Sequence, residues 1–145
     1  MIYLDNSATS YPKPQCVLDG LNKGFELYGA NPGRGSYKMA IETSEQIYNC
    51  RKIISEYFHL PYVENVVFTY NCTTALNMAI KGLAQKGSHF IISNLEHNAV
   101  VRPLENLKKL GICEYSVVEI EDDIYCTLKN FEKEIKNIFN DRYYL

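Results

Sequence analysis

The chain has 145 residues, of which 46% are hydrophobic and 22% charged, with a formal net charge of −2 at pH 7. This length suits one domain with a hydrophobic core. Lys and Arg are scattered and form no basic patch that could bind nucleic acid, and no stretch reaches the roughly twenty apolar residues of a membrane span. The five cysteines are odd in number and never spaced Cys-x-x-Cys, which argues against a disulfide framework or a zinc site and favours a reducing cytoplasm.

The first part of the chain predicts a short strand followed by two helices. Residues 2–4 favour the strand. Pro12 and Pro14 suit a helix start, and apolar residues at helical spacing follow as far as Tyr28. The glycine-rich segment 29–35 is a loop by composition. The second helix has the clearest period, because its residues step by threes and fours and predict one buried stripe, formed by Ala40, Thr43, Ile47, Cys50, Ile54 and Tyr57.

Beyond Pro61 the chain alternates between strand and helix patterns. The patterns predict strands at 65–70, 88–93 and 113–119, and helices at 73–84, 98–110 and near 127–139. This rhythm predicts an α/β fold with three layers, in which helical crossovers connect a mainly parallel sheet. No linker or internal repeat divides the chain, so we expect one domain over 1–145. Ligands in such sheets bind outside the carboxyl ends of the strands.

A polar turn, residues 71–74, follows the strand predicted at 65–70. Asn71 can cap the next helix, and the hydroxyls of Thr73 and Thr74 come beside free backbone N–H groups, which together make a ready anion site. Cys72 lies in the same turn, where packing as a small residue is its ordinary role. Taken alone, these residues are better explained by ordinary helix capping.

A single histidine, His97, follows the next predicted strand. Since the carboxyl ends of neighbouring parallel strands meet at one edge of a sheet, we expect its imidazole near the threonine turn. A phosphate grip with an aromatic ring beside it suits a flat phosphorylated cofactor such as pyridoxal phosphate. The alternative is a surface or capping role. His59 and His89 share no metal-ligand spacing with His97 and are interpreted as structural, so no metal site is expected.

Five segments together resemble the class V aminotransferases, and most closely their cysteine desulfurase-like branch. In the family's order and at compatible spacing they are 2–9, 30–35, 67–69, 75–82 and 96–98. The resemblance runs from Met1 to about Lys136. It implies the amino-terminal part of the large domain of a fold type I pyridoxal phosphate enzyme, normally a homodimer that acts on an amino-acid substrate.

The resemblance also implies roles for the polar turn and the histidine. Thr73 is similar to the threonine that binds the cofactor phosphate, with Asn71, Cys72 and Thr74 completing the turn. His97 resembles the histidine that stacks on the pyridine ring and can help proton transfer. The turn departs from the family's usual Gly-Ala-Thr-Glu or Asn-Ala-Thr-Glu, because Thr74 stands where an acidic residue is usual.

Ala8, Asn31 and Arg34 fall in segments that line the substrate side in this family. Arg34 could bind a carboxylate or phosphate. An equally good explanation of this loop is that its glycines only allow the chain to turn. The family's Schiff-base lysine, pyridine-pairing aspartate, carboxylate-binding arginine and persulfide cysteine all come later than position 145, and residues 137–145 do not resemble its continuation.

We therefore expect a truncated or frameshifted gene, or a designed fragment, that is inactive alone and needs the missing carboxyl-terminal half or further copies of itself. The parent substrate stays open between cysteine, selenocysteine and another amino acid. The alternative interpretation is a non-catalytic α/β module that binds a phosphorylated small molecule or a protein partner.

Overall fold

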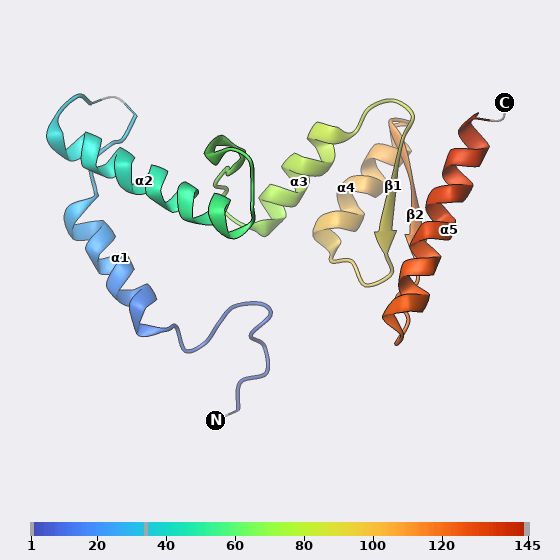
Figure 1. The fold of residues 1–145 in the computed structure, drawn as a ribbon, viewed down its shortest axis with the longest axis horizontal. Coiled ribbons are helices and arrows are strands. Elements are labelled where there is room, and N and C mark those ends of the chain that lie inside the picture. Colours follow the sequence, from blue (N-terminus) through green and yellow to red (C-terminus); the bar gives the residue numbers. More distant parts are fainter. Residues whose placement is uncertain (1, 34, 144–145) are drawn as a thin grey trace. The chain divides into compact units, whose positions relative to one another are not determined.

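The computed structural model describes residues 2–33 and 35–143 and divides into two compact units, Met1–Phe68 and Thr69–Leu145. The first unit is helical. Its elements are α1 (Gln15–Leu27), α2 (Lys38–Tyr57) and a short 3-10 turn, η1 (Val63–Asn65) (Figure 1). Both α-helices confirm the sequence prediction. The organisation of the whole chain as one domain stays a prediction.

The strand predicted at residues 2–4 does not form. A strand exists through ladder hydrogen bonds to a neighbour, and these residues have no ladder partner in the described part of the chain. The Tyr3 hydroxyl donates instead to the backbone oxygens of Asp5 and Thr9, at 3.0 and 2.9 Å. These bonds hold the segment in a local turn.

Only part of the stripe predicted on α2 is buried. Ala40 and Thr43 are 0% and 5% exposed, whereas Tyr57 at the end of the helix is 78% exposed. Within the first unit α2 packs against η1, and a single turn can cover only a short stretch of a 20-residue helix. His59 follows α2 in the left-handed conformation, with φ of 53°, and its N–H donates to the carbonyl of Glu56. His59 therefore ends the helix, in line with its predicted structural role.

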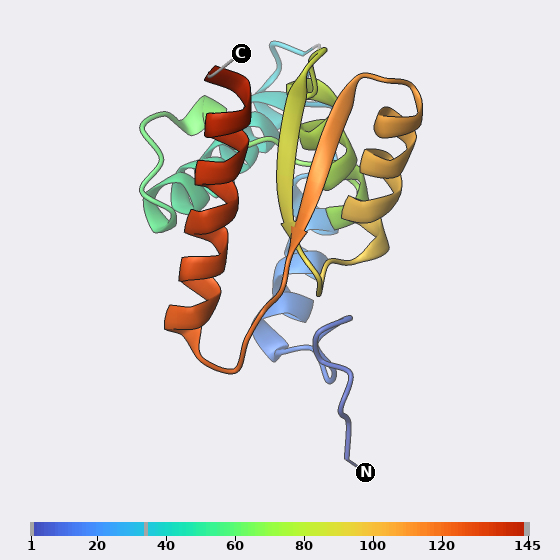
Figure 2. The ribbon, with the colours of Figure 1, turned by 90° about the vertical axis from the view of Figure 1, so that its right-hand side faces the viewer.

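The second unit is an α/β structure with a small parallel sheet. In chain order its elements are α3 (Cys72–Leu83), β1 (Ser88–Ser93), α4 (Asn98–Lys109), β2 (Cys113–Val118) and α5 (Ile124–Tyr143). All five match predicted elements, and α5 extends beyond the predicted 127–139 at both ends. β1 and β2 pair in parallel through the crossover helix α4, with Ser88 opposite Cys113. Helix α4, with α3 packed beside it, covers one face of the sheet and α5 the other, so this unit has three layers (Figures 1 and 2).

The strand predicted at 65–70 is absent from this sheet. Val66 has extended backbone angles, φ −93° and ψ 115°, so the segment has the local conformation of a strand. It has no ladder partner among the described residues, and the boundary between the two units falls within it. The observed sheet therefore has two strands, and the parallel fold is confirmed in this small form.

The hydrophobic core of the second unit lies between the sheet and the helices α3 and α4. Leu104 is fully buried at its centre, in contact with a cluster that comprises Ile80, Ile92, Leu107 and Cys113. Burial raises the pKa of the Cys113 thiol, so this cysteine stays protonated and behaves as a small apolar side chain. This core packs α3 and α4 against the sheet.

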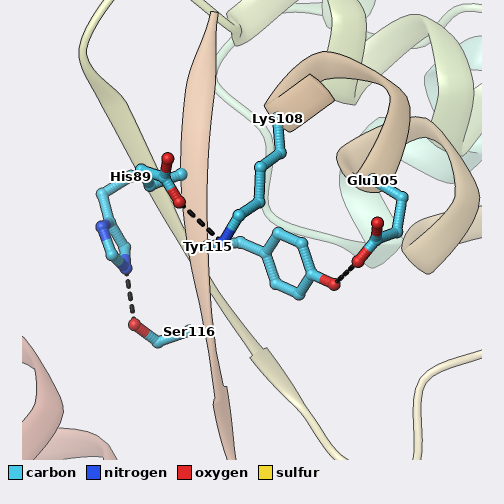
Figure 3. Close-up of polar contacts among 6 residues, drawn as sticks. His89, Glu105, Lys108, Tyr115 and Ser116 are labelled. Atoms are coloured by element: carbon cyan, nitrogen blue, oxygen red, sulfur yellow. Dashed lines mark hydrogen bonds and ion pairs between the residues drawn. The ribbon is translucent and has the colours of Figure 1, made fainter. Parts of the chain in front are cut away.

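Polar contacts join α4 to β2 at the edge of the core (Figure 3). The Tyr115 hydroxyl donates to the Glu105 carboxylate, and the Lys108 ammonium lies 2.8 Å from a carboxylate oxygen of Glu114. The hydrogen bond to Glu105, together with burial and the negative charge of that carboxylate, raises the pKa of the Tyr115 phenol. These contacts connect α4 to the neighbouring strand β2.

The two strands are also joined by side chains, because Nε2 of His89 lies 2.6 Å from the Ser116 hydroxyl (Figure 3). This contact agrees with the structural role predicted for His89. Within residues 2–33 and 35–143, no group of His, Cys, Asp and Glu could hold a metal ion. No helix of that part is long and apolar enough to cross a membrane.

Candidate functional site

Asn71 caps α3, as the sequence predicts. Its side-chain oxygen accepts hydrogen bonds from both the backbone N–H and the hydroxyl of Thr74, at 2.8 and 3.0 Å. Thr74 is therefore occupied by the cap. In the described structure no acceptor faces the backbone N–H of Cys72 or Thr73, and the Thr73 hydroxyl makes no hydrogen bond. Three donors of the exposed first turn are free for a ligand, which is the arrangement that anions favour at a helix start.

His97 caps the next helix, α4. Its Nδ1 accepts the backbone N–H of Ala99 at 3.1 Å, and its carbonyl accepts the N–H of Val100 at 2.8 Å. An accepting Nδ1 carries no proton, so the neutral ring has its hydrogen on Nε2. The ring is exposed, and no described residue bonds to Nε2. The capping role that the sequence left open is thus present, and it leaves one ring nitrogen available.

Thr73 and His97 line one cleft, with a volume of about 470 Å³, between α3 and α4. The remaining lining residues recur mostly every fourth position along the two helices, and they are Asn77, Lys81, Asn98, Ala99, Arg102, Pro103 and Asn106. Two of these side chains are cationic, and no carboxylate is among the described lining residues. The lining therefore combines apolar surface with positive charge and several hydrogen-bond donors, and the charge and donors suit an anionic ligand.

Three further nominated residues belong to the amino-terminal part of the chain. Ala8 and Asn31 are exposed residues of the first unit, and Arg34 lies outside the described residues. The Asn31 side-chain oxygen accepts the N–H of Gly33 at 2.9 Å. A Cβ at Gly35 would clash with the Tyr37 ring, so glycine at this position allows the close approach within the loop. The substrate-side roles of Ala8, Asn31 and Arg34 stay predictions.

The sequence interpretation did not nominate Asn77, Lys81 or Arg102, although all three line the cleft. Their spacing in the sequence could have indicated them. Residues 73, 77 and 81 fall on one face of a helix, as do 98, 102 and 106, so each set forms a stripe. What the pattern could not show is that the two stripes face each other, because that depends on how α3 packs on α4.

Comparison with known proteins decides the family. The family profile described as aminotransferase class-V matches residues 2–140 of the chain. The chain belongs to the class V aminotransferase family. A protein of Vibrio cholerae named probable cysteine desulfurase is 31% identical over 107 residues, which are 71% of this chain and 26% of that protein. The mitochondrial cysteine desulfurase of Eremothecium gossypii is 29% identical over 93% of this chain and 28% of its own length.

A solved structure supports the same assignment. The apo cysteine desulfurase of Thermococcus onnurineus NA1 superposes with a TM-score of 0.77 at 27% identity, over 93% of this chain and 34% of that one. The chain therefore matches part of the fold of a pyridoxal phosphate-dependent enzyme family, and it spans about a quarter to a third of the length of these class V relatives.

Proposed function

We propose that this chain forms the part of a pyridoxal phosphate site, in a cysteine desulfurase-like enzyme, that grips the cofactor phosphate and contacts its ring. The observation that carries the proposal is the shared cleft, which brings Thr73 at the start of α3 and His97 at the start of α4 to one opening. In this family of enzymes the bound cofactor supplies an electron sink for reactions of amino acids.

The free groups at the start of α3 suit the cofactor phosphate. A phosphate monoester dianion carries two negative charges and accepts hydrogen bonds only, so it needs donors and a positive potential. The N–H groups of Cys72 and Thr73 and the Thr73 hydroxyl are such donors, and the amino terminus of α3 adds its partial positive charge. The exposed ring of His97 is the aromatic group that would contact the pyridine face and hold a proton at Nε2.

The expected affinity is low. Three charge-assisted hydrogen bonds of roughly 1.5–3 kcal/mol each stabilise the phosphate by about 5–9 kcal/mol. Association offsets at least roughly 4 kcal/mol of this. The remainder, at most about 5 kcal/mol, corresponds to a dissociation constant of about 0.2 mM or weaker. We therefore propose that the chain by itself does not release sulfur from cysteine, and formation of alanine from cysteine by the purified chain would contradict this.

The groups that complete the site belong, in our proposal, to polypeptide outside these residues. They come either from a separate segment equivalent to the rest of the family fold or from another copy of the chain, and the substrate is an amino acid. Co-expression with a polypeptide that covers the remaining two thirds of a relative's length is expected to restore alanine formation. A stable co-purified complex without activity would contradict the proposal.

We call the Thr73 turn and the His97 ring together the half-site. The test of the half-site is a titration with pyridoxine 5′-phosphate, which keeps the phosphate and ring of the cofactor but lacks the aldehyde that would react with surface lysines. Binding is followed by amide chemical shifts. Thr73→Val removes the hydroxyl at constant shape, and Thr73→Ser restores it. His97→Asn removes the ring but keeps a good helix cap.

We expect saturable shifts at residues 72–74 and 97–99, weaker binding in Thr73→Val and His97→Asn, and near-normal binding in Thr73→Ser. Equal binding by all four proteins, or the absence of ligand-dependent shifts at residues 72–74 and 97–99 up to the solubility limit of the ligand, would overturn the proposal. Inorganic phosphate that binds as tightly as pyridoxine 5′-phosphate, with no dependence on His97, would favour a plain phosphate-binding module instead.

A further inference from the structure

Asn77 connects the two helices that form the cleft. It lies one turn after Thr73 on α3 and is half-buried. Its side-chain nitrogen donates to the carbonyl of Thr73 at 3.0 Å and to the carbonyl of Ala99, in the first turn of α4, at 3.4 Å. One carboxamide, with two hydrogens to donate, thus bridges the first turns of both helices.

The reason for the second bond lies in α4 itself. In an α-helix the carbonyl of residue 99 accepts the backbone N–H of residue 103. Residue 103 is a proline inside the helix, and proline has no N–H. Ala99 is buried at 6% exposure, so little of the residue is accessible to water. Asn77 supplies the donor that Pro103 cannot.

Ala99 is also the residue that holds the candidate imidazole. Its N–H donates to Nδ1 of His97 at 3.1 Å, while its carbonyl accepts from Asn77. A continuous series of hydrogen bonds therefore runs from the backbone of Thr73 through Asn77 and Ala99 to the ring of His97. The two groups of the half-site are tied together through a single side chain.

We propose that Asn77 is a positioning residue, which sets the place of the His97 ring relative to the Thr73 turn by satisfying the carbonyl that Pro103 leaves free. This inference rests on the proposed function for its ligand, but the link itself is a property of the unliganded chain. A purely structural amide would stabilise the packing of α3 on α4 without affecting the ring or the ligand.

The test is a double-mutant cycle between Asn77→Leu, which keeps the approximate shape and removes the donor, and Pro103→Ala, which returns a backbone N–H to the Ala99 carbonyl. The matched control is Ile80→Val, a core change on the same helix outside the cleft. Each protein is measured without ligand, by the nitrogen chemical shifts of the His97 ring and the Ala99 amide, and with pyridoxine 5′-phosphate.

Asn77→Leu is expected to shift both unliganded signals and to weaken ligand binding by about three- to tenfold, within the range for loss of one ordinary hydrogen bond. In the Pro103→Ala background the same substitution should weaken binding by about twofold or less, because the carbonyl has a donor of its own. Ile80→Val should lower stability and leave the ring signals and the affinity unchanged.

Unchanged His97 and Ala99 signals in Asn77→Leu would overturn the inference, as would equal effects of Asn77→Leu in both backgrounds. If the parent chain binds no ligand, the proposed function fails, whereas the signals of the unliganded proteins still decide whether Asn77 positions the ring.

Discussion

Substitution of Asn71 separates the two roles of the α3 amino terminus, helix capping and anion binding. Asn71→Ala removes the acceptor for the Thr74 N–H and hydroxyl. Loss of such a cap costs about 0.5–2 kcal/mol. Since Asn71 is exposed and water can replace its oxygen, we expect about 1 kcal/mol less free energy of unfolding. Phosphate affinity should change little, because the free N–H groups belong to Cys72 and Thr73.

Asn71→Asp is expected to keep or raise stability and to lower phosphate affinity. The carboxylate keeps the capping oxygen and adds a negative charge at the helix start, which stabilises by about 0.3–1 kcal/mol. A phosphate on the neighbouring N–H groups would lie roughly 5 Å from this charge. Like unit charges at that separation repel by about 1–3 kcal/mol between the dielectric limits of water and a protein surface. Affinity for pyridoxine 5′-phosphate should therefore fall at least about fivefold while stability is kept or rises.

The assay pairs urea denaturation, followed by far-ultraviolet circular dichroism, with ligand titration at neutral pH and low salt. Ligand binding by Asn71→Asp that equals the parent chain would refute an anion site at this helix start. An Asn71→Ala protein as stable as the parent would refute the capping argument, since the structure assigns both hydrogen bonds to that oxygen.

Three further outcomes follow from the core, the Tyr115 contact and the exposed surface. Leu104→Ala should lower the free energy of unfolding by about 2–5 kcal/mol in urea denaturation, because the side chain is fully buried, and a smaller loss would mean that the site collapses around the deletion. Because the hydrogen bond to Glu105 raises the pKa of the Tyr115 phenol, its contribution is complete below the unfolded pKa of about 10 and is lost as pH rises through the folded value. The stability difference between the parent chain and Tyr115→Phe should therefore shrink in strongly alkaline solution, and a difference independent of pH would contradict this cause. Unpaired sheet edges and apolar side chains such as Phe25, 84% exposed, should make the chain self-associate, and a sharp monomer in sedimentation at high concentration would contradict that expectation.

Contacts between elements decided several features that local patterns did not determine. The segment 65–70 has a strand-like sequence and extended angles at Val66, yet it is no strand in the described structure, because a ladder needs a partner. Likewise the stripe on α2 is buried at Ala40 and exposed at Tyr57, since burial depends on what lies against the helix. Periodicity reports which side of an element is apolar and carries no information on what covers it.

The sequence alone determined the helices, the strands β1 and β2, the Asn71 cap and the polar residues at the two helix starts. These depend on neighbours within a few positions, so spacing and side-chain chemistry suffice. Only the tertiary structure placed Thr73 and His97 at one cleft and joined them through Asn77 to the carbonyl that Pro103 leaves free. Asn77 and Ala99 are 22 residues apart, and that contact exists only because α3 packs against α4.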